Sequence, residues 1–343
     1  MQNEKNVTFQ DIADYTHFSK TTISRFFNHP ESVTEENRKK IAYAMHALGY
    51  SRNNLARVLA KGNTEFIGLL IPNIYNGFYS MITELFLRTY EKYGYKFIVF
   101  AGSDDNDSEQ QYLNELLSYK VEGLVVLSHT IPSRELAAYN IPVVSIERED
   151  KYISSVNTDN YLGGVQASAL LYKNDCDIFL LLNTPTNSDV PGFGRVQGFI
   201  DTCNEHSLDY RILQYNMAND YESMAESIKH TLNTYVINSY PGKRKGIFCL
   251  SDTCAIIVEN NLIKKYGFMP DDYRIIGFDN TPASLESVLP ITTIGQQADL
   301  IVDSAMQMLI AQIQHKNSDS SAVLKKIIHK VIPPKLIIRD TTK

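Results

Sequence analysis

The sequence predicts a small all-α head followed by a larger α/β core of two doubly wound parallel-sheet subdomains. The chain has 343 residues, more than one ordinary hydrophobic core accommodates. Apolar residues recur at helical spacing between residues 8 and 48, and strand-like apolar runs alternate with amphipathic helical patterns from residue 66 onward. Because these runs are almost continuously hydrophobic, we expect parallel strands that are covered on both faces.

Three short helices are expected in the head, and each begins at a hydroxyl residue that can cap it: Thr8, Ser19 and Thr34. The apolar residues that share a helix face are Phe9, Ile12 and Ala13, then Ile23, Phe26 and Phe27, and finally Ile41, Met45 and Leu48. Glu35 and Glu36 suit the positive end of the third helix, and Gly49 suits its stop. Three such helices can form one compact unit.

The core is predicted from its apolar, β-rich runs. These are residues 66–71, 96–101, 123–128, 142–147, 177–182, 246–251 and 274–279. The chain ends with a helical pattern at 305–314 and two strand-like runs within 329–340. This tail is too short for a domain of its own, so we expect it to cross back and complete the two sheets.

Composition limits the class of protein. Hydrophobic residues make up 43% and charged residues 21% of the chain, as in soluble globular proteins. The sequence has no apolar run of about 18 residues and no signal-peptide core near its start, which predicts a cytoplasmic protein without a membrane partner. The four cysteines show neither C-x-x-C nor zinc spacing, so buried reduced thiols are expected.

Charge is distributed unevenly along the chain. The net charge is −6, yet residues 1–62 contain nine Lys and Arg against six Asp and Glu, and the remainder contains 24 against 33. A basic head on an acidic body predicts a polyanionic partner for the head alone.

The second head helix has an outward face that suits nucleic acid. A plain αα-hairpin would also join two helices tightly. At about 100° per residue, however, Thr21 and Arg25 point away from Ile23, with Lys20 and Ser24 beside them. No acid occurs between residues 19 and 28, whereas a merely solvated face would usually include one. Hydroxyls and cations suit phosphates and base edges, so we favour a helix-turn-helix that reads DNA.

Residues 53–59 allow two interpretations. They can be a plain linker or a two-turn helix that is too short to be stable alone and orders on DNA. In the second case Leu59 could act as an apolar wedge in the minor groove.

Machinery for catalysis is not visible in the sequence, which predicts that the chain is not an enzyme and uses neither a cofactor nor a metal. Gly192, Gly194 and Gly198 miss the spacing of a dinucleotide loop, and residues 104–109 lack the glycine and terminal glutamate of a calcium loop. No nucleophile elbow, phosphate loop or paired-acid motif occurs.

Polar residues gather at the predicted carboxyl ends of the strands, where α/β domains bind ligands. They are Asn73, Asp104, Ser128, Glu147, Asp252 and Asp279. Each one alone could be a helix cap or a loop residue. Together they suit a polar, hydroxyl-rich ligand such as a sugar, held between two sheets.

The sequence resembles the lactose-repressor (LacI/GalR) family of bacterial transcription regulators over essentially its whole length. The head matches in V-T-F-Q-D-I-A (7–13), S-x-T-T-I-S-R-F-x-N (19–28) and A-L-G-Y (47–50), and the following segment in N-N-L-A-R-x-L (53–59). The core matches in I-G-L-L-I-P (67–72), Y-L-x-x-L (112–116), V-E-G-L-V-V (121–126), G-F-D-N (277–280) and T-T-I-x-Q (292–296).

This resemblance implies a helix-turn-helix head at 1–51, a hinge helix and linker at 52–64, and an effector-binding and dimerisation core at 65–343. The core would be periplasmic-binding-protein-like. Its N-subdomain is expected at about 65–159 plus 295–325, and its C-subdomain at about 160–294 plus 326–343.

The resemblance also implies roles for individual residues. Base-facing positions are Lys20, Thr21 and Arg25. Phosphate contacts or caps are Thr8, Ser19, Thr22, Ser24, Asn28, Thr34 and Tyr50, and the minor-groove positions are Asn53, Ala56 and Leu59. Effector-binding positions are Phe78, Tyr79, Glu147, Arg195, Ser251, Asp279 and Gln296.

Three positions depart from the family pattern. His17 stands where the family usually has glycine, so it must adopt an unfavourable backbone conformation. Arg52 replaces the proline that normally opens the hinge and adds a possible phosphate contact. Glu147 stands where aspartate is common and reaches one methylene further.

The function that this resemblance implies is that of a transcription repressor of carbohydrate-utilisation genes. As a homodimer it would bind double-stranded operator DNA on the nucleoid, under the control of a small sugar or sugar phosphate. A purine-responsive regulator, or a global regulator partnered by a phosphocarrier protein, remains an alternative within the family. A sugar-binding receptor is an alternative of another class, but it would explain the core alone.

Overall fold

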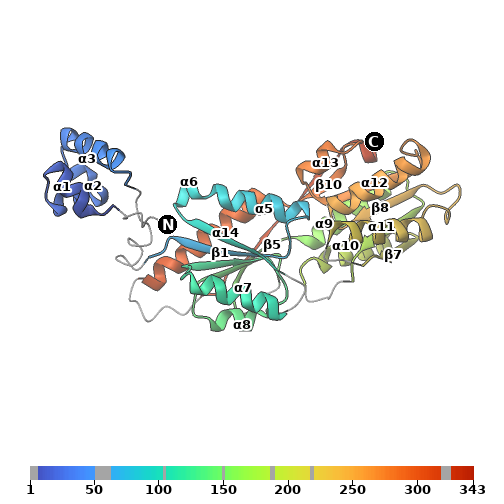
Figure 1. The fold of residues 1–343 in the computed structure, drawn as a ribbon. Coiled ribbons are helices and arrows are strands. Elements are labelled where there is room, and N and C mark those ends of the chain that lie inside the picture. Colours follow the sequence, from blue (N-terminus) through green and yellow to red (C-terminus); the bar gives the residue numbers. More distant parts are fainter. Residues whose placement is uncertain are drawn as a thin grey trace. The chain divides into compact units, whose positions relative to one another are not determined.

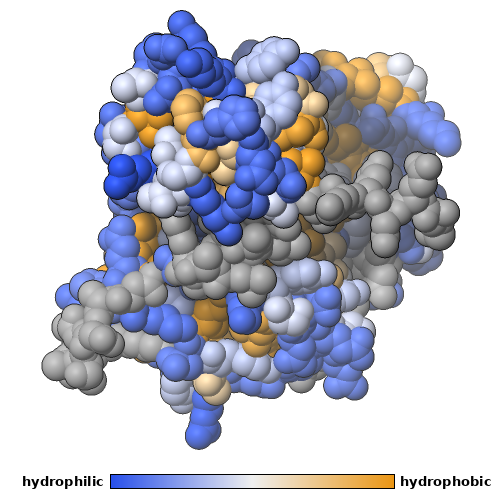
Figure 2. All heavy atoms as spheres, turned by 60° about the vertical axis from the view of Figure 1, so that its left-hand side comes forward, coloured by the Kyte–Doolittle hydropathy of each residue, from blue (hydrophilic) through white to orange (hydrophobic). Residues whose placement is uncertain are grey.

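The computed structural model describes residues 7–50, 63–102, 106–148, 151–185, 190–216, 220–317 and 326–343. The chain forms two compact units, residues 1–63 and 64–343 (Figure 1). No helix in the described ranges is both long enough and apolar enough to cross a membrane. The face drawn in Figure 2 is mostly hydrophilic, with hydrophobic residues in separate patches.

Residues 7–50, the described part of the head, form three α-helices and a short 3-10 turn. They are α1 (Phe9–Thr16), α2 (Lys20–Asn28), η1 (Pro30–Ser32) and α3 (Glu35–Ala47). The predicted caps are confirmed, because the hydroxyls of Thr8, Ser19 and Thr34 each accept a hydrogen bond from a backbone N–H in the first turn. Gly49 has a φ of 66°, which suits the predicted stop after α3.

A small hydrophobic core holds these helices together. Its buried members are Ile12, Ala13, Ile23, Val33, Ile41 and Ala44. Aromatic side chains extend it, and the rings of Phe9 and Phe27 stack with centroids 4.8 Å apart. The apolar side of α2 is thus used inside the head, and its opposite side faces outward.

The first sheet of the core has six parallel strands in the order β11-β5-β4-β3-β1-β2. They are β1 (Phe66–Ile71), β2 (Lys96–Ala101), β3 (Gly123–Val126), β4 (Val143–Ile146), β5 (Ser154–Thr158) and β11 (His329–Ile332). The helices of this subdomain are α5 (Gly77–Arg88), α6 (Tyr90–Tyr93), α7 (Asn106–Ser118), α8 (Ser133–Ala138) and α14 (Ala298–Asn317). Alternate strand residues pack against α5 and α14 on one face and α7 and α8 on the other (Figure 1).

The second sheet has the order β12-β10-β9-β8-β6-β7, and among its described strands only the pair β10–β12 is antiparallel. Its strands are β6 (Ile178–Asn183), β7 (Tyr210–Gln214), β8 (Lys245–Cys249), β9 (Tyr273–Asp279), β10 (Thr292–Gly295) and β12 (Lys335–Ile337). Its helices are α9 (Asn160–Lys173), α10 (Phe193–Glu205), α11 (Tyr221–Tyr235), α12 (Asp252–Tyr266), α13 (Pro282–Glu286) and the 3-10 turn η2 (Asp340–Thr342). Helices α9 and α10 cover one face, and α11 and α12 the other, which confirms the predicted fold class.

The C-terminal tail completes both sheets, as predicted, but the predicted boundary is wrong for residues 329–332. These residues form β11, which pairs in parallel with β5 of the first sheet instead of joining the second subdomain. Helix α14 packs against the first sheet beside this edge, so the chain that follows it can add a strand there. Pro333 and Pro334 cannot donate to a ladder, and Lys335–Ile337 then pairs with β10.

Two glycines let α9 and α10 approach each other closely. A Cβ on Gly164 would lie 2.2 Å from the carbonyl oxygen of Arg195, and a Cβ on Gly198 would lie 2.2 Å from that of Tyr161. Any side chain at either position would therefore push the two backbones apart. This contact places the first turn of α10 beside the first turn of α9.

Gly198→Ala should destabilise the core by about 1–3 kcal/mol, because the added methyl group overlaps a backbone carbonyl that cannot rotate away. Scanning calorimetry of the whole chain measures this loss as a lower Tm. Gly192→Ala, at the N-cap of the same helix, is the control, since a Cβ there meets nothing within 4 Å. Equal Tm values for the two variants would contradict the close helix contact.

Candidate functional site

The outward side of α2 carries the three residues predicted to face bases. Lys20, Thr21 and Arg25 are all exposed. Within the described part of the chain, neither the Lys20 ammonium nor the Arg25 guanidinium has an ion-pair or hydrogen-bond partner. Their donors are therefore available to acceptors outside the protein, such as phosphate or guanine oxygens.

The neighbouring polar residues stiffen α2. Ser19 Oγ accepts a hydrogen bond from Thr22 N at 3.1 Å and lies 2.8 Å from Thr22 Oγ1. Asn28 Nδ2 donates to the Ser24 carbonyl at 3.0 Å. The exposed caps Thr8 and Ser19 mark helix N-termini, where backbone dipoles favour an anion.

The third cap and the other predicted DNA residues lie in different surroundings. Thr34 is exposed at the start of α3, and Tyr50 is half-buried with its ring 5.8 Å from that of Phe27. Part of Tyr50 thus belongs to the core of the head. The residues predicted for the minor groove and hinge lie outside the described residues: Arg52, Asn53, Ala56 and Leu59.

His17 adopts the left-handed conformation that its position in the turn requires. Its φ and ψ are 57° and 27°, and its backbone N–H bonds to the Ala13 carbonyl to close α1. This confirms the expected left-handed conformation, which is unfavourable for a residue with a Cβ. The tight turn nevertheless forms and leads directly into Ser19 and α2.

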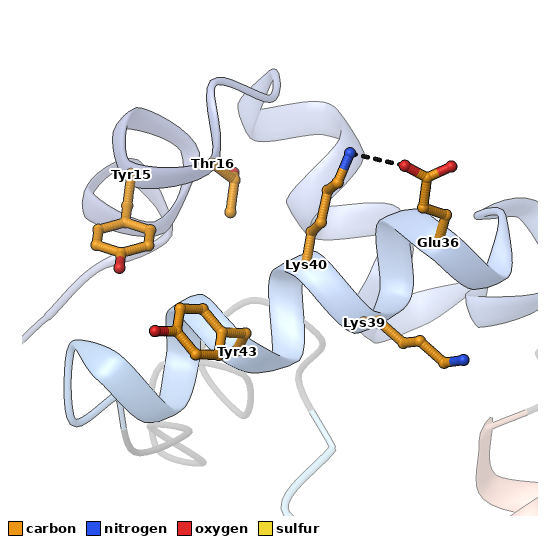
Figure 3. Close-up of a pocket in the computed structure, with 6 residues that line it drawn as sticks. All are labelled: Tyr15, Thr16, Glu36, Lys39, Lys40 and Tyr43. Atoms are coloured by element: carbon orange, nitrogen blue, oxygen red, sulfur yellow. Dashed lines mark hydrogen bonds and ion pairs between the residues drawn. The ribbon is translucent and has the colours of Figure 1, made fainter.

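A shallow depression of about 440 Å³ lies between α1 and α3 of the head (Figure 3). It is lined by Tyr15, Thr16, Glu36, Lys39, Lys40 and Tyr43. Lys40 Nζ bonds to Glu36 Oε1 at 2.8 Å across one turn of α3. None of the predicted DNA-binding residues lines it.

In the core, Arg195 lies at the centre of a buried polar cluster. It extends from the first turn of α10, and its side chain is only 11% exposed. Its Nε donates to Asn160 Oδ1 at 2.7 Å, and its Nη1 donates to the Leu250 carbonyl at 2.8 Å. The guanidinium also lies over the ring of Phe278, 3.6 Å from its centroid.

Glu147 reaches this arginine from the other subdomain. It follows β4 of the first sheet and is buried, with Oε2 accepting from Arg195 Nη2 at 3.4 Å and from Asn160 Nδ2 at 3.0 Å. Its other oxygen, Oε1, accepts from Thr158 N at 2.5 Å. Glu147 has a φ of 55°, and such strain in a buried residue points to a functional position.

Asp279 supplies the second carboxylate of the cluster. It ends β9 with a φ of 110°, and Oδ1 lies 3.9 Å from Arg195 Nη1. The same oxygen accepts from Gln296 Nε2 at 2.5 Å, while Gln296 Oε1 accepts from Thr158 Oγ1 at 2.7 Å. Burial raises the pKa of Asp279 to about 8, although the nearby Arg195 charge opposes this rise.

The remaining predicted effector residues lie in different surroundings. Tyr79 is half-buried, and its pKa is raised by burial and by the charge of Asp279, so its hydroxyl stays protonated. Phe78 is buried in the core of the first subdomain. The hydroxyl of Ser251 caps α12 by accepting from Cys254 N at 3.2 Å.

Two residues at the cluster were missed in the sequence. Thr158 and Asn160 contact both carboxylate-bearing subdomains, at the point where the chain leaves β5 and enters α9. Polar residues after a strand could have indicated these two positions. The strand itself was not recognised, however, because β5 reads S-S-V-N-T and lacks the apolar pattern of a strand.

Asp252, at the first position of α12, serves the structure of the second subdomain. It accepts from Thr281 N at 2.6 Å and from Thr293 Oγ1 at 2.6 Å, which ties together the ends of β9 and β10. Burial raises its pKa to about 6. Asp104 lies outside the described residues, and Ser128 bonds to the buried Glu109.

No group of three or more His, Cys, Asp or Glu in the described ranges is arranged to hold a metal ion. The four cysteines are free and buried, as predicted.

Comparison with known families identifies the chain. Residues 8–53 match the family of bacterial regulatory proteins named after lacI, and residues 169–342 match the periplasmic binding protein-like domain. The chain belongs to the lacI family of bacterial transcription regulators. Its helix-turn-helix head therefore binds DNA, and its relatives are regulators, not enzymes.

Individual relatives match along nearly the whole chain. The sucrose operon repressor of Streptococcus mutans is 28% identical over 92% of this chain and 95% of its own length. The ribose operon repressor of Halalkalibacterium halodurans is 27% identical over 98% of this chain and 97% of its own length. A crystal structure of a periplasmic binding protein/LacI transcriptional regulator from Alkaliphilus metalliredigens, complexed with D-xylulofuranose, is 28% identical. It superposes with a TM-score of 0.68 over 81% of this chain and 99% of its own.

The raised pKa of Asp279 predicts a pH-dependent stability. The folded carboxyl keeps its proton up to about pH 8, whereas the unfolded one releases it near 3.8, so the free energy of unfolding falls as the pH rises between these values. Asp252 acts in the same direction, with a pKa of about 6. Asp279→Asn mimics the protonated form and should reduce the fall in Tm between about pH 5 and pH 8.

Thermal unfolding across this pH range measures the effect. Glu115→Gln, at an exposed position of α7, is the control and should follow the wild-type curve. If Tm of Asp279→Asn depends on pH in the same way as Tm of the wild type, Asp279 is already ionised in the folded protein and the prediction is wrong.

Proposed function

We propose that this regulator represses carbohydrate-utilisation genes and that a small sugar or sugar phosphate, bound around Arg195, controls its affinity for the operator. The observation that carries the proposal is the buried cluster of Arg195, Glu147 and Asp279. It offers charged donors and acceptors side by side, as sugar hydroxyls require. The named relatives, which are repressors of sucrose and ribose operons, support the same class of ligand.

On DNA, the proposed reading element is α2. Two heads of a homodimer would place Lys20, Thr21 and Arg25 in successive major grooves of a pseudo-palindromic operator. The remaining predicted contacts, including the minor-groove residues Asn53, Ala56 and Leu59, would fix register and orientation.

The ligand would act through the relative position of the two subdomains. Glu147 and Thr158 belong to the first subdomain. Arg195 contacts Glu147 from the second subdomain, and Gln296, in the segment that crosses back between β10 and α14, accepts a hydrogen bond from Thr158. A ligand that replaces these contacts favours one arrangement over another. A differential affinity of about 1–3 kcal/mol is enough for such coupling to the DNA-binding form.

Arg25→Ala should weaken binding to a specific operator by about 1–3 kcal/mol more than binding to random duplex, because a base contact is lost together with a phosphate attraction. Fluorescence anisotropy can compare a duplex selected by the purified protein from a random pool with an unselected duplex. Lys39→Ala, exposed on α3, is the control. An equal loss on both duplexes would exclude Arg25 as a base reader.

Arg195→Ala should preserve operator binding and abolish the response to the effector. The effector can be sought by thermal shift with sucrose, D-ribose, D-xylulose and their phosphate esters, and with purines as the alternative class. The compound that stabilises the protein is then titrated against the operator complex. An unchanged response of Arg195→Ala would remove this residue from the site, and stabilisation by purines alone would overturn the sugar proposal.

A further inference from the structure

We propose that Glu147 determines ligand specificity by excluding phosphorylated sugars, so that the effector is an uncharged sugar. This inference rests on the proposed function, because it concerns the same site around Arg195. It narrows the ligand class from sugars and sugar phosphates to sugars without an anionic group.

The guanidinium of Arg195 is already neutralised by this protein. Its Nη2 donates to the Glu147 carboxylate at 3.4 Å, and its Nη1 lies 3.9 Å from Asp279 Oδ1. One cation therefore faces two buried acidic side chains. Even when Asp279 holds its proton, Glu147 alone balances the arginine, and no positive charge is left to bind a phosphate.

Glu147 is held firmly in this position. Its Oε1 accepts a hydrogen bond from Thr158 N. The side chain of Asn157 fixes the backbone of the next residue, since its Oδ1 accepts from Arg148 N at 3.1 Å and its Nδ2 donates to Arg148 O at 2.9 Å. The carboxylate would thus have to break several hydrogen bonds to move away from an anion.

Helix N-termini nearby offer no substitute for the arginine. Asp159 caps α9 by accepting from Leu162 N at 2.9 Å, and Ser251 caps α12 with Asp252 in its first turn. The first N–H groups of α10 bond to the carbonyls of Val190, Pro191 and Gly192. Side-chain caps therefore take one first-turn N–H of α9 and one of α12, and carbonyls of the preceding turn take three N–H groups of α10, which leaves fewer backbone donors for a phosphate.

The cation that directly follows Glu147 is also engaged within the protein. The buried Arg148 directs its Nη2 to the Ile131 carbonyl at 2.6 Å and its Nη1 to the Ser128 carbonyl.

A sugar hydroxyl fits this arrangement, whereas a phosphate does not. The hydroxyl can donate to a carboxylate oxygen and accept from the guanidinium at the same time. A phosphate oxygen only accepts, and it would meet the Glu147 lone pairs without a proton between them. Such a juxtaposition of like charges is an effective means of rejecting a ligand.

The test is a binding comparison by isothermal titration calorimetry on the full chain. The probes are D-ribose with D-ribose 5-phosphate, sucrose with sucrose 6-phosphate, and D-xylulose with D-xylulose 5-phosphate. In the pair that binds, the wild-type protein should prefer the uncharged sugar by at least about tenfold.

Three variants test whether the charge or the length of the side chain at position 147 causes the preference. Glu147→Gln keeps the length of the side chain and removes its charge. The ratio of the Kd of the phosphate ester to the Kd of the uncharged sugar should therefore fall by about tenfold. Glu147→Asp keeps the charge and should retain a preference for the uncharged sugar, while Glu115→Gln on the exposed face of α7 should match the wild type.

The outcomes distinguish this inference from the proposed function. If the wild-type protein binds a phosphate ester more tightly than the matching uncharged sugar, this inference is overturned, while the proposed sugar-type effector stands. An unchanged preference in Glu147→Gln would overturn the role of Glu147. Binding of none of these compounds would overturn the proposed effector class, and this inference with it.

Discussion

The contact between Arg195 and Glu147 is the interaction on which the rest of the core depends. It joins a helix of the second subdomain to a strand end of the first, and both side chains are almost fully buried. A buried arginine without its carboxylate partners would be very unfavourable, so the two subdomains are held in register by the same groups that a ligand must contact. Binding and the arrangement of the subdomains are therefore linked through one set of atoms.

The fold brings these atoms together through unfavourable backbone conformations and a close contact between two helices. Glu147 and Asp279 both have positive φ values, and the backbones of α9 and α10 touch at Gly164 and Gly198. Such strain persists only when the surrounding packing enforces it. The head shows the same principle at His17, where a tight turn aligns α2 so that its polar side faces outward.

Much of this architecture could be predicted from the sequence, because apolar periodicity and capping residues report local physics directly. The three head helices and the seven apolar strands follow from such patterns. The strands β5 and β7 did not, since S-S-V-N-T is polar and Y-R-I-L-Q lies at a sheet edge. The roles of Thr158 and Asn160 also escaped prediction, because their contacts join positions far apart in the chain. Strand β11 was predicted in the wrong subdomain. Its pairing with β5 depends on where α14 ends in space, and local sequence patterns do not report this position.

The most direct test of this account is a double-mutant cycle between the two subdomains. The stabilities of Glu147→Gln, Arg195→Met and the double variant are measured by denaturant unfolding of the full chain without ligand. If the ion pair couples the subdomains, the double variant should lose at least about 1 kcal/mol less than the sum of the single losses. Additive losses would contradict the central role of this contact.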